Sequence, residues 1–253
     1  MAKMGIALQL YTLRNETATD FAGTLRRVAE IGYEGVEFAG YGGLAPQELK
    51  ALLAELNLKA VGSHVSLARL KDNLDEEIEM NLAIGNKYVI CPYLVEADRQ
   101  EPGLHATLEV FKEAAEKLAQ HGIQFGYHNH AFELEEKVGD KLLFDHIFAE
   151  LPADKAVVEM DVCWVTVGGQ DPVAYIGKYA GRLPLLHLKD IRKDDEGKIQ
   201  TVELGQGDVD LPAVIEAAGN AGTEWLVVEQ DHCQNPPIES VTNSMGWLKQ
   251  NYL

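Results

Sequence analysis

The sequence is poor in cysteine, in basic residues and in long apolar runs. Its three cysteines (Cys91, Cys163 and Cys233) form no CxxC spacing and leave an odd number, so a disulfide framework is not expected. No apolar run approaches the ~18 residues that a membrane span needs. The start, Met1–Gly5, lacks the basic segment, long apolar stretch and cleavage site of a signal peptide. These absences predict a cytoplasmic protein.

Positive charge is scarce. The chain of 253 residues has 22 Lys and Arg against 40 Asp and Glu, which gives a formal net charge of −18. Nucleic-acid binding depends on basic patches that meet phosphates, and anionic membrane surfaces attract the same residues. The composition therefore disfavours nucleic acid and membrane as partners, and it leaves a small polar molecule or a metal cation open.

Two kinds of segment alternate along the chain. Eight short runs rich in Val, Ile, Leu and aromatic residues are typical of strands, and segments of helical period lie between them. The expected strands are Gly5–Tyr11, Gly35–Phe38, Leu58–Val65, Tyr88–Pro92, Ile123–His128, Ala156–Asp161, Leu183–Leu188 and Glu224–Glu229. The expected helices are Thr24–Ile31, Pro46–Leu56, Asp75–Gly85, Leu104–Leu118, Leu143–Leu151, Val173–Tyr179, Leu211–Ala221 and Pro237–Leu248.

Several of these strands are continuous apolar runs, as in PLLHL and WLVVE. Such runs are typical of parallel strands that are buried on both faces under helices. Eight β/α units without a linker predict one α/β domain over residues 1–253, a single (β/α)8 TIM barrel. A doubly wound open sheet is the alternative architecture.

Polar residues interrupt the strands at their C-terminal ends, where a barrel places its active site. They are Glu37, His64, His128, Asn129, His130, Asp161, His187, Lys189, Glu229 and Asp231. Imidazoles and carboxylates that converge suit a divalent cation. The candidate ligands are His128, Asp161, His187 and Glu229, one from each of strands five to eight, for Mn, Zn, Co or Mg.

Each of these residues also has a structural interpretation. A lone strand histidine such as His187 is often a hydrogen-bonded core residue. Asp161 and Glu229 could form a salt bridge inside the barrel, and Lys189 could be buried against a neighbouring carboxylate. The GQGDVD string at Gly205–Asp210 lacks the spacing of a phosphate loop, so we expect it to lead into a helix that Asp210 caps. An unphosphorylated substrate is favoured.

Five strings in order, GYHNHAFELE, VVEMDVCWVTVGGQDP, LPLLHLKDIR, ELGQGDVDLPAVI and WLVVEQD, resemble the sugar phosphate isomerase/epimerase family with the xylose isomerase-like TIM barrel. The resemblance implies a divalent metal held by Glu, Asp, His and Glu from strands five to eight. Asp161, His187 and Glu229 match the last three. The strand-five position departs, because it offers His128 where the sugar epimerases have a glutamate that works in acid–base catalysis.

That departure leads to further assignments. Glu133 is a candidate replacement base or a further ligand, and Trp164 falls where the epimerases place a substrate-contacting histidine. We expect Glu133, Glu229 and Lys189 to be catalytic. The expected substrate-binding residues are Glu37, His64, Asn129, His130 and Trp164.

The function that these residues predict is a divalent-metal-dependent isomerase or epimerase of a small sugar or polyol. Such an enzyme removes the proton next to a carbonyl and passes through a metal-stabilised enediolate. The alternative is a metal-dependent lyase or dehydratase acting on a keto-cyclitol or 3-keto-glycoside. A nuclease of the AP-endonuclease type and a non-catalytic sugar-binding barrel are less favoured, and a homo-oligomer is compatible with all four.

Overall fold

Eight parallel strands close into a barrel in the computed structural model, which describes residues 3–194 and 196–253. The strands are β1 (Gly5–Gln9), β2 (Gly35–Phe38), β3 (Lys59–His64), β4 (Tyr88–Cys91), β5 (Gln124–His128), β8 (Ala156–Asp161), β9 (Leu185–Leu188) and β12 (Trp225–Val228). Their order around the barrel is β1-β12-β9-β8-β5-β4-β3-β2. The barrel prediction is confirmed, and the open-sheet alternative is wrong because β1 pairs with both β2 and β12.

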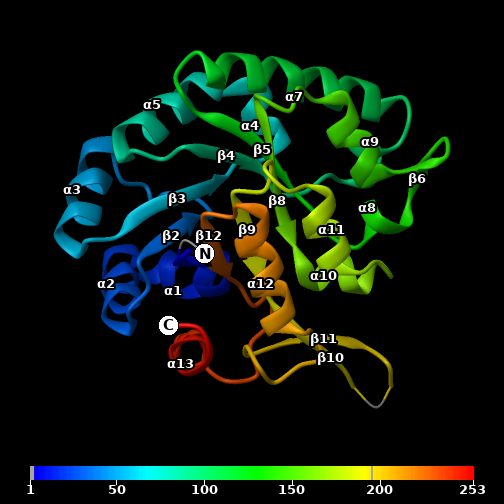
Figure 1. The fold of residues 1–253 in the computed structure, drawn as a ribbon. Helices are drawn as coiled ribbons and strands as arrows, with labels where there is room; N and C mark the ends of the chain where they lie inside the picture. Colours follow the sequence, from blue (N-terminus) through cyan, green and yellow to red (C-terminus); the bar gives the residue numbers. More distant parts are fainter. Residues whose placement is uncertain (1–2, 195) are drawn as a thin grey trace.

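Helices surround the barrel (Figure 1). The larger ones are α2 (Phe21–Ile31), α3 (Pro46–Leu56), α5 (Leu74–Ile84), α7 (Gly103–Ala119), α9 (Leu143–Glu150), α11 (Pro172–Lys178), α12 (Leu211–Ala221) and α13 (Pro237–Asn251). Shorter ones are the 3-10 helix η1 (Leu10–Leu13) with α1 (Arg14–Thr19), α4 (Leu67–Asp72), α6 (Glu96–Arg99), α8 (Phe132–Glu135) and α10 (Val162–Val167). No helix of the described residues is both long and apolar enough to cross a membrane.

Local sequence explains where the helices begin and end. In α7 the stripe from Leu104 to Leu118 is buried against the barrel, as the four- and three-residue spacing predicts. Asp210 caps α12 through the backbone N–H of Ala213, which confirms that expectation. Gly32 ends α2 with φ 108°, a left-handed backbone that favours glycine.

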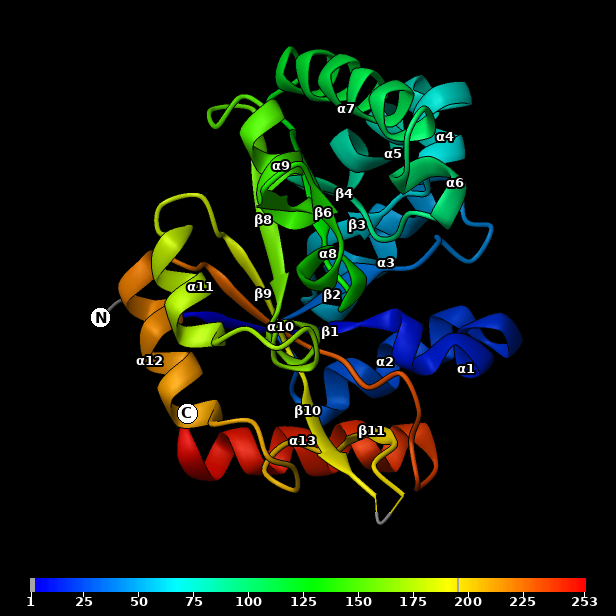
Figure 2. The ribbon, with the colours of Figure 1, turned by 90° about the vertical axis from the view of Figure 1, so that its right-hand side faces the viewer.

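Two antiparallel hairpins interrupt the β/α alternation and were not expected from the sequence. One pairs β6 (Lys137–Val138) with β7 (Lys141–Leu142), and the other pairs β10 (Asp190–Lys193) with β11 (Ile199–Val202). Figure 2 shows the second hairpin projecting from the barrel on the same side as α13. Both follow C-terminal strand ends, so they add to the face of the barrel that carries the polar residues.

The barrel interior changes character along its axis. A separate apolar cluster fills it toward the N-terminal ends of the strands: Ala7, Val61, Tyr88, Ile90, Val157, Leu185 and Val227. Since residues two apart share a face, β8 continues inward from Val157 to Glu159 and Asp161. In the same way β9 continues from Leu185 to His187 and Lys189. Because of this two-residue period, the inward side chains are apolar toward the N-terminal ends of the strands and polar, though still buried, toward their C-terminal ends.

Candidate metal centre

The four residues expected to bind metal come together at the C-terminal end of the barrel. His128, Asp161, His187 and Glu229 are all buried, and each offers one ligand atom within 4.8 Å of the others. Asp161 and His187 are direct neighbours in the parallel ladder of β8 and β9. The His128 Nε2–Asp161 Oδ2 distance is 3.4 Å, and His187 Nδ1 lies 3.9 Å from the same oxygen.

The donors in this set fit a divalent cation. The His128 Nε2 atom is buried without a hydrogen-bond partner, which is costly unless another group satisfies it, and Asp161 Oδ2 lies 3.4 Å from this atom. Burial, helped by the nearby His187, lowers the pKa of His128, so its ring keeps a lone pair for a metal. Burial opposes ionisation of Asp161, but Lys189 and His128 outweigh it and lower its pKa. Two imidazoles and two carboxylates suit Zn or Mn.

Lys189 supplies a fixed positive charge beside this set. Its Nζ lies 2.9 Å from Asp161 Oδ2, 2.9 Å from Glu229 Oε2 and 2.8 Å from Asp231 Oδ2, and its side chain is fully buried. Burial disfavours the ammonium, yet the three carboxylates hold the pKa of Lys189 well above its usual range. Lys189 is therefore buried against carboxylates, as its structural interpretation expects, and it also faces the candidate ligands, as its expected catalytic role requires.

A cavity of about 490 Å³ opens onto the same residues. It is lined by Tyr11, Ala39, His64, Ser66, Pro92, Tyr93, His128, His130, Glu229 and Asp231. The lining contains no lysine and no arginine, and Tyr11 and Tyr93 are about half exposed within it, at 46% and 47%. The wall therefore offers aromatic faces and carboxylates rather than a site for a phosphate.

The expected substrate-binding residues divide between the cavity and the interior. His64 and His130 line the cavity, and Trp164 stacks on His130 with ring centroids 5.8 Å apart. Asn129 is buried elsewhere, because its amide oxygen accepts from the Asp161 backbone N–H at 2.9 Å and its amide nitrogen donates to the Asp161 carbonyl. Glu37 is fully buried below the cavity beside His187.

Glu133 lies outside the cluster of candidate ligands. Its carboxylate accepts from the Tyr127 hydroxyl and, at 2.8 Å, from the backbone N–H of His130. Both oxygens are therefore engaged in holding the loop that follows β5. Burial raises the pKa of Glu133 to about 7, although the Tyr127 hydroxyl opposes the shift.

This pKa gives Glu133 a measurable effect on stability. In the unfolded chain the carboxyl titrates near 4.5, so the folded state binds a proton there that the unfolded chain loses first. Stability is then lost as the pH rises toward 7. We expect the free energy of unfolding of the wild type to fall, relative to Glu133→Gln, by about 2 kcal/mol between pH 5 and pH 7. Urea unfolding at both pH values measures this.

Glu135→Gln is the control, because Glu135 is exposed on the same short helix. Its unfolding free energy should follow the wild-type pH curve. Parallel curves for the wild type and Glu133→Gln would contradict the role of Glu133 as a buried titrating group.

The glycines of the GQGDVD string contribute to a hydrogen-bonded loop around Asp190. The Asp190 carboxylate accepts from the backbone N–H groups of Ile191, Gly205, Gly207 and Val209. A Cβ at Gly207 would lie 2.2 Å from Asp190 Oδ1, so only glycine permits this close approach. The loop thus wraps an aspartate of its own chain.

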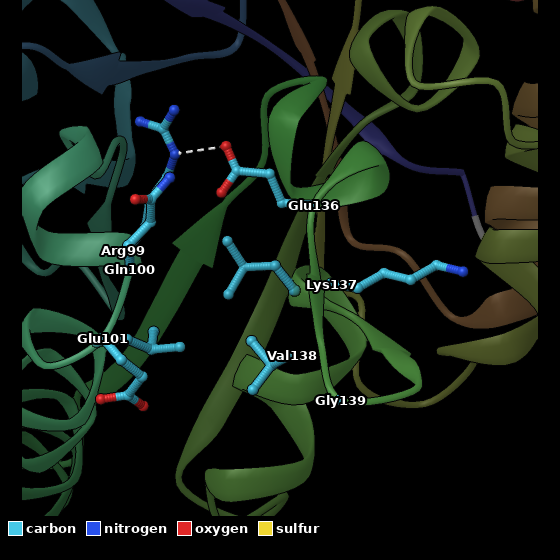
Figure 3. A pocket seen from close by; sticks show the side chains of 9 residues that line it. Arg99, Gln100, Glu101, Glu136, Lys137, Val138 and Gly139 are labelled. Atoms are coloured by element: carbon cyan, nitrogen blue, oxygen red, sulfur yellow. Dashed lines mark hydrogen bonds and ion pairs between the residues drawn. The ribbon is translucent and has the colours of Figure 1, made fainter.

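A second hollow lies outside the barrel, between α6 and the β6–β7 hairpin (Figure 3). Arg99 and Glu136 face each other in it at 3.0 Å, and Lys137 extends away from that pair. Neither group of candidate metal ligands found among the described residues includes a residue that lines this hollow. Both groups of candidate metal ligands among the described residues therefore lie in the barrel and not in this hollow.

Two neighbours of the candidate ligands were not assigned a role from the sequence. Glu159 precedes Asp161 by two residues and points into the barrel beside His64 and His187. Asp231 follows Glu229 by two residues and pairs with Lys189. Their spacing of two residues from Asp161 and Glu229 could have identified them in the sequence, because it places both side chains on the inward face of their strands.

Fold and site together define a (β/α)8 barrel of the kind that binds its ligand at the C-terminal strand ends, with a candidate metal centre there. The chain belongs to the xylose isomerase-like TIM barrel family, which matches residues 25–251. This confirms the resemblance seen in the sequence.

Individual relatives carry several activities. An inosose dehydratase of Mesomycoplasma hyopneumoniae (strain J) is 26% identical, over 98% of this chain and 95% of its own length. A sugar phosphate isomerase/epimerase structure from Parabacteroides distasonis has a TM-score of 0.82 at 24% identity, over 98% of this chain and 94% of that one. A D-allulose 3-epimerase from Methylomonas sp. has a TM-score of 0.74 at 14% identity, over 98% of each chain. The two structures show the shared fold.

Proposed function

We propose that the protein is a divalent-metal-dependent lyase that removes water from a keto-polyol, with a keto-cyclitol as the favoured substrate. The observation that carries this proposal is the single cluster of proton-transfer groups at the cavity wall. Lys189 Nζ lies within 2.9 Å of both Glu229 and Asp231, and these two carboxylates line the cavity. The similarity to an inosose dehydratase over nearly the whole chain supports the same reaction class.

Under this proposal His128, Asp161, His187 and Glu229 would hold the metal. A divalent cation there would supply Lewis acidity toward substrate oxygens. The protein contributes a buried and largely dry floor under the cavity, since all four side chains are at most 5% exposed. Fixed charges act strongly in such a setting because little water screens them.

Dehydration needs one proton to be removed and one to be delivered. The proton leaves the carbon next to the carbonyl for a carboxylate, for which we propose Glu229. The C–O bond at the neighbouring carbon then breaks. The departing hydroxyl takes a proton from Asp231, which lines the cavity and receives that proton from Lys189 Nζ at 2.8 Å, and it leaves as water. The products are the unsaturated ketone and one water. Lys189 regains its proton from Glu229, which lies 2.9 Å away.

This arrangement suits elimination because both protons pass on one side of the substrate. Epimerisation instead needs two acid–base groups on opposite faces of the same carbon. His128 stands where the sugar epimerases have the second glutamate, and Glu133, its candidate replacement, is bound to Tyr127 and His130. We therefore propose Glu133 as a residue that holds the β5 loop rather than as a base.

Isomerisation or epimerisation remains the second candidate, on one observation. His64 lines the cavity together with Glu229, so an imidazole and a carboxylate are both accessible to one substrate. Burial lowers the pKa of His64, but Glu37 and Glu159 outweigh it and raise the pKa to about 10, which favours an acid role.

The substrate that the cavity favours is neutral. With no lysine or arginine in the lining, a phosphate would meet Glu229 and Asp231 without a compensating cation. Tyr11, Tyr93 and His130 offer aromatic surface to the apolar face of a ring. Lys189 is the nearby cation, and its charge is already balanced by three carboxylates.

Incubation of the purified protein with an inosose and Mn²⁺ in D₂O tests the proposal. We expect mass spectrometry to show a product that has lost one water and absorbs in the ultraviolet. An epimerase or isomerase would instead return substrate of unchanged formula with deuterium at carbon. Tight binding without either reaction would contradict both proposals and indicate a sugar-binding barrel.

A further inference from the structure

A second polar cluster lies in the barrel directly below the proposed ligands. Glu37, His64 and Glu159 join His187 there, and one ligand atom of each lies within 4.8 Å of the others. His187 Nε2 is 2.6 Å from Glu37 Oε2, and His64 Nε2 is 2.7 Å from Glu159 Oε2. The cross distances are longer, at 3.3 Å for His64–Glu37 and 3.4 Å for His187–Glu159.

The spacing of these atoms indicates hydrogen bonds rather than a second cation. Two atoms that bind one ion at about 2.0–2.1 Å in a tetrahedral site lie about 3.3 Å apart. The two shortest contacts of this cluster, at 2.6 and 2.7 Å, are lengths typical of charge-assisted hydrogen bonds. In the proposed ligand set the shortest of the recorded contacts between ligand residues is longer, at 2.9 Å for His187–Glu229, and the contacts of His128 and His187 with Asp161 are 3.4 and 3.9 Å.

His187 connects the two clusters through its two ring nitrogens. Nδ1 faces the proposed ligand set, 2.9 Å from Glu229 Oε2, and Nε2 faces Glu37. A carboxylate only accepts, so Nε2 carries the hydrogen in this contact. The hydrogen bond to Glu37 therefore fixes the ring plane. Glu229 is also a carboxylate, so Nδ1 donates to it here, and a metal would displace this hydrogen to take Nδ1 as its ligand atom.

Three local features aim the Glu37 carboxylate at this ring. The β2–β3 pairing shifts by one residue between Val36 and Glu37, which changes the direction of the strand locally. Gly62 gives the carboxylate room, because a Cβ there would lie 2.2 Å from Glu37 Oε1. Gln9 donates to Glu37 Oε2 at 2.8 Å and holds it from the other side.

We propose that Glu37 is a positioning residue that sets the orientation of His187 toward the metal, and that this lower cluster holds protons instead of a second ion. The proposal rests on the metal centre of the proposed function. Partners of this kind keep a ligating histidine in the orientation that the metal needs, and losing one typically weakens metal affinity about 10–100-fold.

Calorimetric titration of the metal-free protein with Zn²⁺, and the absorption spectrum of its Co²⁺ form, test the proposal. We expect one ion per wild-type chain. Glu37→Gln should bind that ion about 10–100-fold more weakly and give an altered Co²⁺ spectrum. Gly62→Ala should shift both readouts in the same direction, because it displaces the carboxylate without removing any polar group.

Gly177→Ala is the matched control, because a Cβ at Gly177 meets nothing within 4 Å. It should keep the wild-type affinity and spectrum, and circular dichroism verifies that each variant folds. Two ions per wild-type chain, or unchanged affinity in both Glu37→Gln and Gly62→Ala, would overturn the proposal while leaving the metal centre in place. No binding by the wild type would overturn the metal centre itself.

Discussion

Replacing Asp161 with asparagine is expected to remove metal binding and to reduce turnover by about 1,000-fold, because Lewis acidity contributes several kcal/mol to such reactions. Asp161 is fully buried within the proposed ligand set, and its Oδ2 lies 3.4 Å from His128 Nε2 and 2.9 Å from Lys189 Nζ. Its other oxygen, Oδ1, accepts from the Trp164 backbone N–H at 3.0 Å and caps α10. Asparagine keeps an oxygen for this cap and removes the charge.

The measurement is calorimetric titration with Zn²⁺ or Mn²⁺ alongside the dehydration assay. Asp171→Asn is the matched control, because Asp171 caps α11 through the Val173 N–H and is distant in sequence from the strand ends. The control should keep its metal affinity and its rate. Full affinity in Asp161→Asn would contradict the proposed ligand set.

Lys189→Met is expected to lower the free energy of unfolding of the metal-free protein by about 3–5 kcal/mol. The substitution preserves the length of the side chain but leaves Asp161, Glu229 and Asp231 close together without their shared cation. Buried carboxylates that lose their partner repel one another and are poorly solvated. The variant should also lose dehydration activity, because Lys189 is the proposed source of the proton that Asp231 delivers.

A divalent cation would replace part of that lost charge, so Mn²⁺ should raise the melting temperature of Lys189→Met more than that of the wild type. Thermal melts with chelator and with Mn²⁺ measure this difference. Lys178→Met is the control, because Lys178 is half exposed in its 2.7 Å pair with Asp145, and such a pair contributes less than about 1 kcal/mol. Equal losses in the two variants would contradict the role of Lys189.

The fold was predictable because the strand pattern is strong. All eight strands lie where the apolar runs placed them: two have the expected bounds, and six are shorter by one or two residues at one or both ends. The first was expected to reach Tyr11 and stops at Gln9, because the Gln9 side chain accepts from the Tyr11 N–H and starts η1. The seventh begins at Leu185 instead of Leu183, since Pro184 has no N–H to donate. The short hairpins carry too few residues to give a periodic signal.

The site was predictable as a group of residues but not in its contacts. Position at a strand end was enough to gather His128, Asp161, His187 and Glu229. The same rule could not tell that Glu37 points down to His187, because that depends on a register shift between β2 and β3. It also missed that Asn129 binds the backbone of Asp161 in β8 and that Glu133 binds the backbone of His130, since both contacts depend on the path of the chain after β5.

The reaction class, too, depends on the contacts of the site residues and not only on their presence at the strand ends. The sequence favoured an isomerase or epimerase, whereas a relative similar over nearly the whole chain is named an inosose dehydratase. We propose the dehydratase alternative because Glu229 and Asp231 line one cavity and share the buried Lys189 between them, an arrangement that the sequence alone does not reveal.

The loop around Asp190 also constrains the neighbouring residue, Lys189. Four backbone N–H groups donate hydrogen bonds to the Asp190 carboxylate on the outer side of the strand end. Consecutive side chains of an extended chain point to opposite sides. The hydrogen bonds that hold Asp190 outward therefore also resist rotation of the backbone at Lys189, whose side chain points inward. A rotation there would swing the ammonium out of the barrel. The glycine loop therefore helps to hold Lys189, the proposed proton source, in position from outside the barrel.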